Sequence, residues 1–296
     1  MKKSLQSSLV GPLCVLFGYL TFSTNGMWLL LSPEGATPYT VSAFRMTIGA
    51  SVLFLLLKWQ GKRICLKDWN LKYLLIYGVG TWAYQLTFYN AVLAVGIAVG
   101  TVVSVGTTPI FAAVLEWVIR KKTPQKMWYV ATLLAIAGVV LLNRVDSHFE
   151  WIDLSIPLLA GFFSGATLLA GPELTRGHDP QIGGTLSAML IAFLMLPFFI
   201  FFPTDWVLSL RGAICVLMLG IVNTAIGYLL VFRGFQTTQA TVAASLTLAE
   251  PMGATLIGMI FLGEDSTLFS IAGIVCILVS VIVLVMAEAH SQKSLA

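Results

Sequence analysis

The chain has 296 residues, of which 58% are hydrophobic and only 10% are charged, and its mean hydropathy is +0.91. A soluble domain normally carries about 25% charged residues. This composition therefore excludes a soluble enzyme, a nucleic-acid-binding module, a disulfide scaffold and a disordered chain. A membrane-spanning helix needs about 20 apolar residues, which leaves room for about ten helices with short loops. We predict an all-α integral membrane protein.

Ten apolar runs, bounded by charges or by Gly/Pro turns, follow one another along the chain. The first begins after Lys2 and Lys3, as in a signal peptide, but it is too long for a signal peptide and is expected to be a retained helix. The fifth is short, and Lys126 stands at its start. The predicted helices cover residues 9–31, 39–58, 72–94, 98–119, 125–142, 154–173, 182–202, 211–232, 240–262 and 267–287.

The basic residues between these runs are distributed unequally. With the N-terminus placed inside, the cytoplasmic loops and termini hold almost all Lys and Arg residues, whereas the other side holds only Arg144 and Arg211. Lys and Arg are retained on the cytoplasmic side of membranes. We therefore expect a multi-pass protein of a bacterial-type cytoplasmic (inner) membrane with both termini in the cytoplasm.

The second half of the chain repeats the first. An offset of 141 or 142 residues aligns the second predicted helix through to the ninth with almost no gap. We expect two five-helix repeats, residues 1–146 and 147–296, and the odd number of helices in each makes them inverted. Inverted repeats are typical of secondary transporters, whose substrate site lies near the membrane midplane between the repeats. The most specific aligned pairs are Pro38 with Pro180, Gly78 with Gly220, Pro109 with Pro251, and Phe22-Ser23 with Phe163-Ser164.

Glu250 lies near the middle of the ninth predicted helix, directly before Pro251. A charged side chain at that depth costs at least about 2.5 kcal/mol, so it is a functional candidate by default. Pro251 has no amide hydrogen and disfavours helical geometry in the residue before it, which predicts a kink. Glu250 either binds an amine or a proton, or is a structural carboxylate hydrogen-bonded to neighbouring helices.

Two further ionisable residues lie within predicted helices. Arg45, near the outer end of the second, either contacts a substrate carboxylate or pairs with an acid in a gate. Alternatively it extends to the outer interface or braces backbone carbonyls. Glu116 lies one turn from the cytoplasmic end of the fourth helix and forms an i,i+4 pair with Arg120. Extension of its side chain to the interface explains it.

Prolines and hydroxyls recur near mid-membrane in the fourth and ninth helices. Pro109 and Pro251 are candidate hinges, and the carbonyl groups that they free must find partners in protein or line a wet cavity. The hydroxyls there, with the amide and aromatic groups of other helices, either form a substrate cavity or only satisfy the backbone and anchor the interfaces. The candidate cavity residues are Asn25, Trp82, Tyr84, Gln85, Ser104, Thr108, Ser164, Asn223, Thr224, Tyr228, Ser245, Thr247 and Glu250.

Taken together, these features resemble the drug/metabolite transporter (DMT) superfamily, specifically its bacterial ten-helix EamA-type permeases. The resemblance covers nearly the whole chain. It implies a basket of helices around a central cavity, with the fifth and tenth helices at the periphery, and transport of small metabolites without ATP, most often export of amino acids or related compounds. It rests on the five-helix repeat and on Phe22-Ser23-Thr24, Arg45 in A-F-R-M-T-I-G-A, Ala249-Glu250-Pro251, Phe261-Leu262-Gly263-Glu264 and Ala272-Gly273.

We therefore expect a non-enzymatic secondary transporter that moves a small amphipathic metabolite, an amino acid or related amine, outward by alternating access. Its partners would be the substrate, a proton and the bilayer, with no nucleic acid, cofactor or metal, and it would act as a monomer or weak homodimer. The alternatives are an importer or antiporter of a quaternary amine or a nucleotide-linked metabolite, and, in another class, a membrane-embedded enzyme or scaffold.

Overall fold

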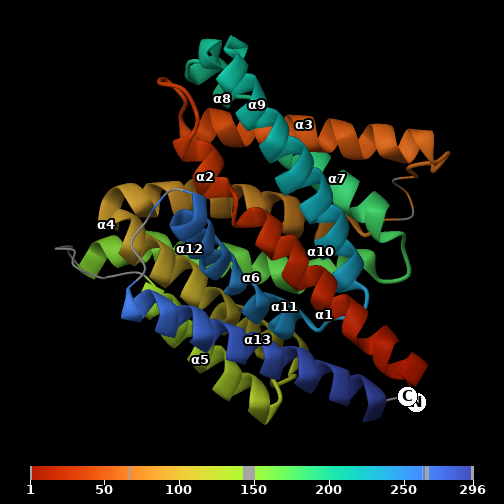
Figure 1. Ribbon diagram of the computed structural model, residues 1–296. Helices are drawn as coiled ribbons and strands as arrows, with labels where there is room; N and C mark the ends of the chain where they lie inside the picture. The colour runs from red at the N-terminus through yellow and green to blue at the C-terminus, as the bar shows by residue number, and fades with distance from the viewer. Residues whose placement is uncertain are drawn as a thin grey trace.

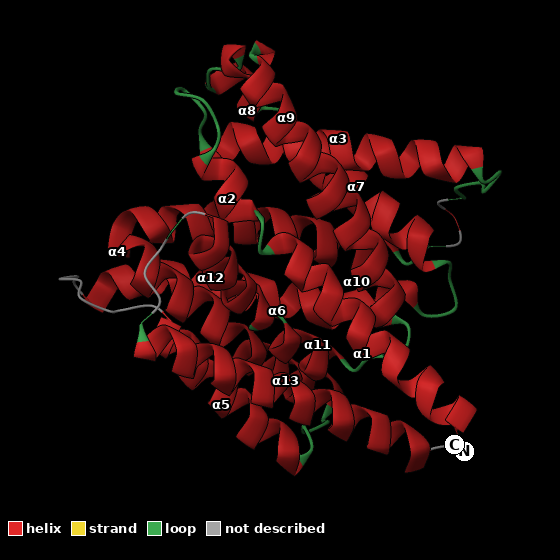
Figure 2. Ribbon diagram, viewed as in Figure 1, coloured by secondary structure: helices red, strands yellow, loops and turns green. Residues whose placement is uncertain are grey.

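The computed structural model describes residues 2–65, 67, 69–142, 151–261, 263 and 267–294. Every regular element within these ranges is a helix (Figures 1 and 2). In chain order the helices include α1 (Lys2–Phe22), α2 (Asn25–Leu30), α3 (Pro38–Trp59), α4 (Leu71–Arg120), α5 (Lys126–Leu142), α6 (Ser155–Thr175), α7 (Pro180–Met195), α8 (Phe198–Phe201), α9 (Leu210–Met218), the π-helical segment η4 (Leu219–Ile226), α10 (Gly227–Phe235), α11 (Ala240–Leu246), α12 (Ala249–Phe261) and α13 (Leu268–Ser294).

Eight helical spans in the described part of the chain are long and apolar enough to cross a bilayer. The fifth predicted helix forms α5, which has only 17 residues. The third and fourth predicted helices are joined in α4, where Gly96 adopts φ 80° and ψ 165°. Only glycine enters that backbone region readily, and the chain folds back there, because Gly100 lies against the backbone of Val92. The predicted all-helical membrane fold with ten helical segments is confirmed.

Three spans are interrupted near their middle. The first span breaks at Ser23 and Thr24, between α1 and α2, and the eighth contains the π-helical turn of η4. The ninth breaks at Thr247 and Leu248, close to the kink expected at Pro251. Because Pro251 has no amide hydrogen, the Thr247 carbonyl accepts instead from the amide of Glu250 at 2.9 Å.

The contacts between helices follow the two-repeat pattern. Equivalent helices of the two halves pack against each other, α3 against α7 and α5 against α13. The contact of α1 with η4 and α10 has its counterpart in the contact of α6 with α4. This exchange of partners is the signature of a pseudo-twofold axis, as expected for inverted repeats. In Figure 1, α5 and α13 lie side by side at the edge of the bundle.

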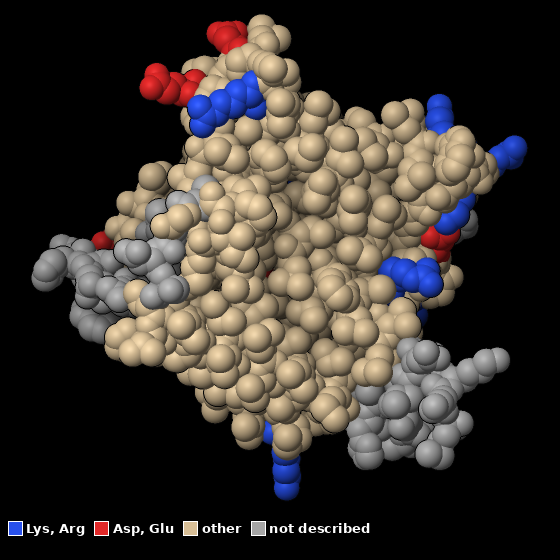
Figure 3. Space-filling view, in the orientation of Figure 1, with Lys and Arg blue, Asp and Glu red and all other residues tan. Residues whose placement is uncertain are grey.

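The two ends of the bundle differ. The start of α1 and the end of α13 lie together at one end, which we call the terminal end (Figure 1). Lys and Arg gather toward this end, on the right in Figure 3, and acidic residues project at the upper left. Packing is also tighter there, because all seven residues of α11 are buried whereas α2, toward the opposite end, has no buried residue.

We predict that Gly96→Ala lowers the free energy of unfolding by about 1–3 kcal/mol, because the φ/ψ region of Gly96 is nearly closed to other residues. Gly26→Ala is the control, since Gly26 is helical and an added Cβ there meets nothing within 4 Å. Thermal unfolding of the purified proteins in detergent measures both. Equal melting temperatures of the two variants would contradict the proposed role of Gly96 in the turn.

Candidate functional site

A cavity of about 110 Å³ lies in the middle of the bundle. This is room for several water molecules. Both halves of the chain contribute side chains to it, from the first, second, third, fourth, sixth, eighth and ninth helical segments. The lining residues are Tyr19, Phe22, Asn25, Arg45, Tyr77, Thr81, Tyr84, Gln85, Val105, Thr108, Ser164, Thr167, Leu168, Tyr228, Thr247 and Glu250.

Most of the residues proposed from the sequence line this cavity, and the second helical segment joins the set through Arg45. The structure places the others of that set outside the lining. Those outside are Trp82, Ser104, Pro109, Asn223, Thr224, Ser245 and Pro251.

Some of the side chains outside the lining pack against neighbouring helices. The Ser245 hydroxyl is 2.8 Å from the Thr132 hydroxyl, so it connects α11 to α5. Thr224 packs where a Cβ on Gly49 would be, between η4 and α3. Ser104 is fully buried, and its carbonyl accepts from the Thr108 hydroxyl at 3.0 Å. Ser245 and Thr224 therefore stabilise contacts between helices, and none of the three residues lines the cavity.

The lining residues that the sequence-based set of candidates does not contain are Tyr19, Phe22, Tyr77, Thr81, Val105, Thr167 and Leu168. Helical spacing carried a signal for two of them. Thr81 lies one turn before Gln85, and Thr167 lies three residues after Ser164, so each shares a helix face with a residue already proposed.

Arg45 on α3 is at the centre of a hydrogen-bond cluster. Its Nη1 donates to Oδ1 of Asn25 at 2.8 Å and to Oδ1 of Asn223 at 3.1 Å, and its Nη2 donates to Oε1 of Gln85 at 2.8 Å. All three acceptors are neutral amides, and Arg45 forms no ion pair with any residue that the structure describes. The positive charge of Arg45 is therefore positioned but not neutralised.

Asn223 has a defined amide orientation in this cluster. Its Nδ2 donates to the Thr21 carbonyl at 3.0 Å and lies 3.4 Å from the Thr24 hydroxyl, which leaves Oδ1 to face Arg45. Asn223 thus ties the break in the first span to the π-helical turn of the eighth, although it does not line the cavity. It acts on the site through Arg45.

Glu250 lies in the first turn of α12 and lines the same cavity. Its backbone carbonyl accepts from the Ser23 hydroxyl at 2.8 Å, which joins α12 to the break in the first span. Its carboxylate makes no hydrogen bond or ion pair with the described residues, Arg45 included. The cavity therefore holds one cation and one carboxylate that do not neutralise each other by direct contact.

Several donors around Arg45 have no partner within the described chain. Arg45 Nε, Gln85 Nε2 and Thr81 Oγ1 are buried and make no hydrogen bond. An unpaired buried polar group costs about 1–3 kcal/mol, and these three groups belong to residues that line one cavity. Within the described residues, His, Cys, Asp and Glu form no cluster suited to a metal ion.

Aromatic rings form another part of the wall. The rings of Tyr19 and Phe22 meet edge to face with centroids 5.3 Å apart, and Phe22 contacts Tyr228 at 6.3 Å. Tyr84 lies beside Phe88 at 5.8 Å. These faces suit an apolar group or, through cation–π attraction, a bound ammonium.

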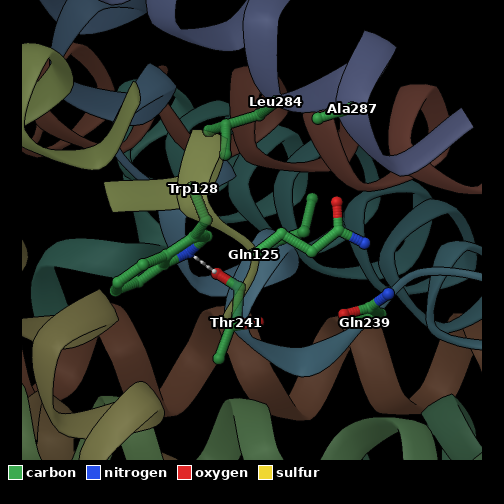
Figure 4. Close-up of a pocket in the computed structure, with 7 residues that line it drawn as sticks. Gln125, Trp128, Gln239, Thr241, Leu284 and Ala287 are labelled. Atoms are coloured by element: carbon green, nitrogen blue, oxygen red, sulfur yellow. Dashed lines mark hydrogen bonds between the residues drawn. The ribbon is translucent and has the colours of Figure 1, made fainter. Parts of the chain in front are cut away.

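A second cavity, shown in Figure 4, lies between α5, α11 and α13 and measures only about 10 Å³. Trp128 Nε1 donates across it to the Thr241 carbonyl at 3.1 Å. A space of this size holds at most one water molecule. It belongs to the packing of these helices and is too small for a metabolite.

Comparisons with known proteins agree with this architecture. The model of the EamA-like transporter family matches residues 9–144 and again residues 151–286. The chain is 34% identical to the uncharacterized transporter YwfM of Bacillus subtilis over 95% of both chains. It is 22% identical to the threonine/homoserine exporter RhtA of Escherichia coli K12 over 77% of this chain and 75% of RhtA. A solved crystal structure covers 94% of this chain and 98% of its own, with TM-score 0.81 and 16% identity, which shows a shared fold.

We predict that Asn223→Leu lowers the free energy of unfolding by about 1–3 kcal/mol, because it removes the donor to the Thr21 carbonyl and one acceptor of Arg45. Asn90→Leu is the matched control, since Asn90 is exposed and donates only to the Leu86 carbonyl of its own helix. Thermal unfolding compares the two variants. A larger loss for Asn90→Leu would overturn the role given to Asn223.

Proposed function

Because the chain belongs to the EamA-like transporter family, we propose that it is a secondary transporter that exports a small amphipathic amino acid or related amine by alternating access. One observation carries the proposal: a single cavity holds a positioned cation with unpaired donors and a separate free carboxylate. This arrangement is complementary to a zwitterion. The name of RhtA, a threonine/homoserine exporter, supports the same class of substrate.

Each part of the substrate has a partner in this proposal. The carboxylate accepts hydrogen bonds from Arg45 Nε, Gln85 Nε2 and Thr81 Oγ1, and the ammonium donates to Glu250. Charge-assisted bonds of this kind are about twice as strong as neutral ones. The remaining cavity residues from the sequence analysis, Asn25, Tyr84, Thr108, Ser164, Tyr228 and Thr247, complete the wall.

Alternating access would arise from exchange of conformation between the halves, residues 1–146 and 147–296. The tight packing of α11 supports a state in which the terminal end is closed. The basic residues at that end support its placement in the cytoplasm of a bacterial-type inner membrane. The breaks before Pro251 and at Ser23 supply places where the spans bend, with Pro109 as the counterpart of Pro251 in the first half.

Coupling to protons is assigned to Glu250, the free carboxylate of the cavity. A proton and the substrate ammonium would compete for it, so proton entry would release the amine. Since the cavity is formed within one chain, we propose that the monomer is the transporting unit, alone or in a weak homodimer.

A quaternary amine is the second candidate substrate, and the aromatic wall favours it. The rings of Tyr19, Tyr84 and Tyr228 line the cavity that holds Glu250, and aromatic faces attract quaternary ammonium groups. Such a substrate, moved by import or antiport, would make no use of the donors around Arg45.

Glu250→Gln is expected to reduce transport at least tenfold and to remove its response to an imposed proton gradient, because glutamine holds neither the charge nor the proton. The assay is counterflow of labelled threonine or homoserine in proteoliposomes, with and without a pH gradient. Glu34→Gln is the control, since Glu34 is an exposed carboxylate. Unchanged coupling in Glu250→Gln would rule out its role.

Arg45→Met is expected to weaken binding of amino acids about tenfold to a hundredfold, the loss of a charged hydrogen-bond donor worth about 1.5–3 kcal/mol. It should leave binding of amines without a carboxylate unchanged. A thermal-shift series with amino acids, polyamines and quaternary amines measures this. Equal losses for both ligand classes would mean that Arg45 does not bind the carboxylate.

A further inference from the structure

Among the residues that the structure describes, two ion pairs join the halves of the chain, and both lie at the terminal end. The first connects Lys62, just after α3, to Asp179, the residue that caps α7. Lys62 Nζ is 2.6 Å from Asp179 Oδ2 and donates to Gln181 Oε1 at 2.9 Å. The two charged side chains are each about one-third exposed, 34% and 33%.

The surroundings of Asp179 favour the ionised form of its carboxyl group and hold that group in position. Burial raises the pKa of its carboxyl, but the hydrogen bond from Lys62 and the backbone amides of Gln181 and Ile182 outweigh burial and lower the pKa below its ordinary value. The preceding His178 stacks on Trp69 with ring centroids 4.6 Å apart. Loops of both halves therefore meet at this point in a fixed arrangement.

The second ion pair connects the end of α4 to the end of α6. Arg120 Nη2 is 3.0 Å from Glu173 Oε1, and Arg120 Nη1 is 3.5 Å from Glu116 Oε1. Arg120 also contacts the Leu169 carbonyl at 3.4 Å, and Arg176 adds a second cation to Glu173 at 2.8 Å. The Glu173 side chain is only 10% exposed, so solvent screens this pair less than a surface pair.

The pseudo-equivalent positions at the opposite end are neutral. The offset of 142 residues aligns Thr37 with Asp179 and Lys62 with Thr204. In the sequence it also aligns Arg120 with Leu262, which lies outside the described residues. The offset of 141 that aligns the first and sixth helices aligns Glu173 with Ser32. Within the described residues, all the ion pairs between halves are at the terminal end. At the opposite end Arg211 Nε contacts a carbonyl, that of Leu31, at 2.5 Å.

We propose that Lys62–Asp179 and Arg120–Glu173 are two charged clasps that hold the terminal end closed and bias the resting transporter toward the state open at the opposite end. The inference rests on the alternating access proposed above. In an inverted repeat, the two states exchange the contacts of the two ends. Ends of equal chemistry would give states of equal energy, whereas charged clasps at one end favour its closure.

The size of the bias follows from the measured worth of such pairs. A partly exposed ion pair changes an equilibrium about threefold, so two clasps give a ratio of about ten to one. Clasps of this strength set the resting state without blocking the exchange. They also make the ratio depend on ionic strength, because the Debye length falls from about 10 Å to about 3 Å between 0.1 and 1 M salt.

The test measures the two states directly, without substrate. Spin labels are placed at Thr123 and Arg233, exposed positions of the two halves at the terminal end, after replacement of the four cysteines by alanine. Distances are measured in nanodiscs by pulsed electron paramagnetic resonance. We expect mainly one short distance in the starting protein. In Asp179→Asn with Glu173→Gln, a longer distance should gain about tenfold relative to the short one.

Two matched variants make the result specific. The charge swap Lys62→Asp with Asp179→Lys restores attraction and should restore the part of the short-distance population that this ion pair contributes. Either substitution alone should enlarge the long-distance population. Asp205→Asn removes an exposed carboxylate that has no ion pair with the described residues, and it should change nothing.

Unchanged distance populations in the double neutral variant would overturn the clasps, as would an equal shift in Asp205→Asn. If the double variant does not fold, the starting protein in 1 M salt provides the same comparison, and an unchanged ratio there also overturns the proposal. A shift in distance together with absent transport of amino acids would support the clasps and count against the proposed substrate.

Discussion

The structure depends on how an arginine is accommodated inside an apolar bundle. Arg45 is more than a polar residue at a helix end, because its guanidinium donates to amide oxygens of three other helical segments. A charge within a membrane protein is tolerated only where it faces the interior and finds partners. Neutral amides supply those partners while leaving the charge itself available, and a carboxylate in the same place would have neutralised it.

This accommodation explains why the helices near the cavity are irregular. At the break after Phe22 the Thr21 carbonyl accepts from the amide and the hydroxyl of Thr24, and Asn223 both donates to the same carbonyl and accepts from Arg45. Asn223 itself belongs to a π-helical turn, a type of turn that is frequent at functional sites. The break before Glu250 places its carboxylate in the same cavity. In uninterrupted helices the backbone groups at these breaks would be hydrogen-bonded within their own helices.

The two halves share a backbone arrangement but differ in charge, and this difference makes the two ends of the bundle unequal. In the repeat, the position equivalent to Arg45 is Ser187, and the position equivalent to Glu250 is Thr108. Each half thus contributes one charge to the cavity, and neither charge has a charged counterpart. The same holds for the two ends of the bundle, where Asp179 caps α7 at the terminal end and the neutral Thr37 caps α3 at the opposite end. In the proposed alternating access, inverted symmetry would provide two states, and the unequal side chains would make those states unequal in energy.

The sequence by itself determined the helical class, the positions of the spans, the duplication and the two deep charges, because each of these is a property of hydropathy or of residue order along one chain. Helical spacing also located much of the cavity, since residues one turn apart share a face. Only the tertiary structure decided which neighbour each face meets. It turned Ser245 toward Thr132, placed three amides around Arg45 and left Glu250 unpaired, because the rotation of a helix about its axis is set by its packing partners and not by its own periodicity.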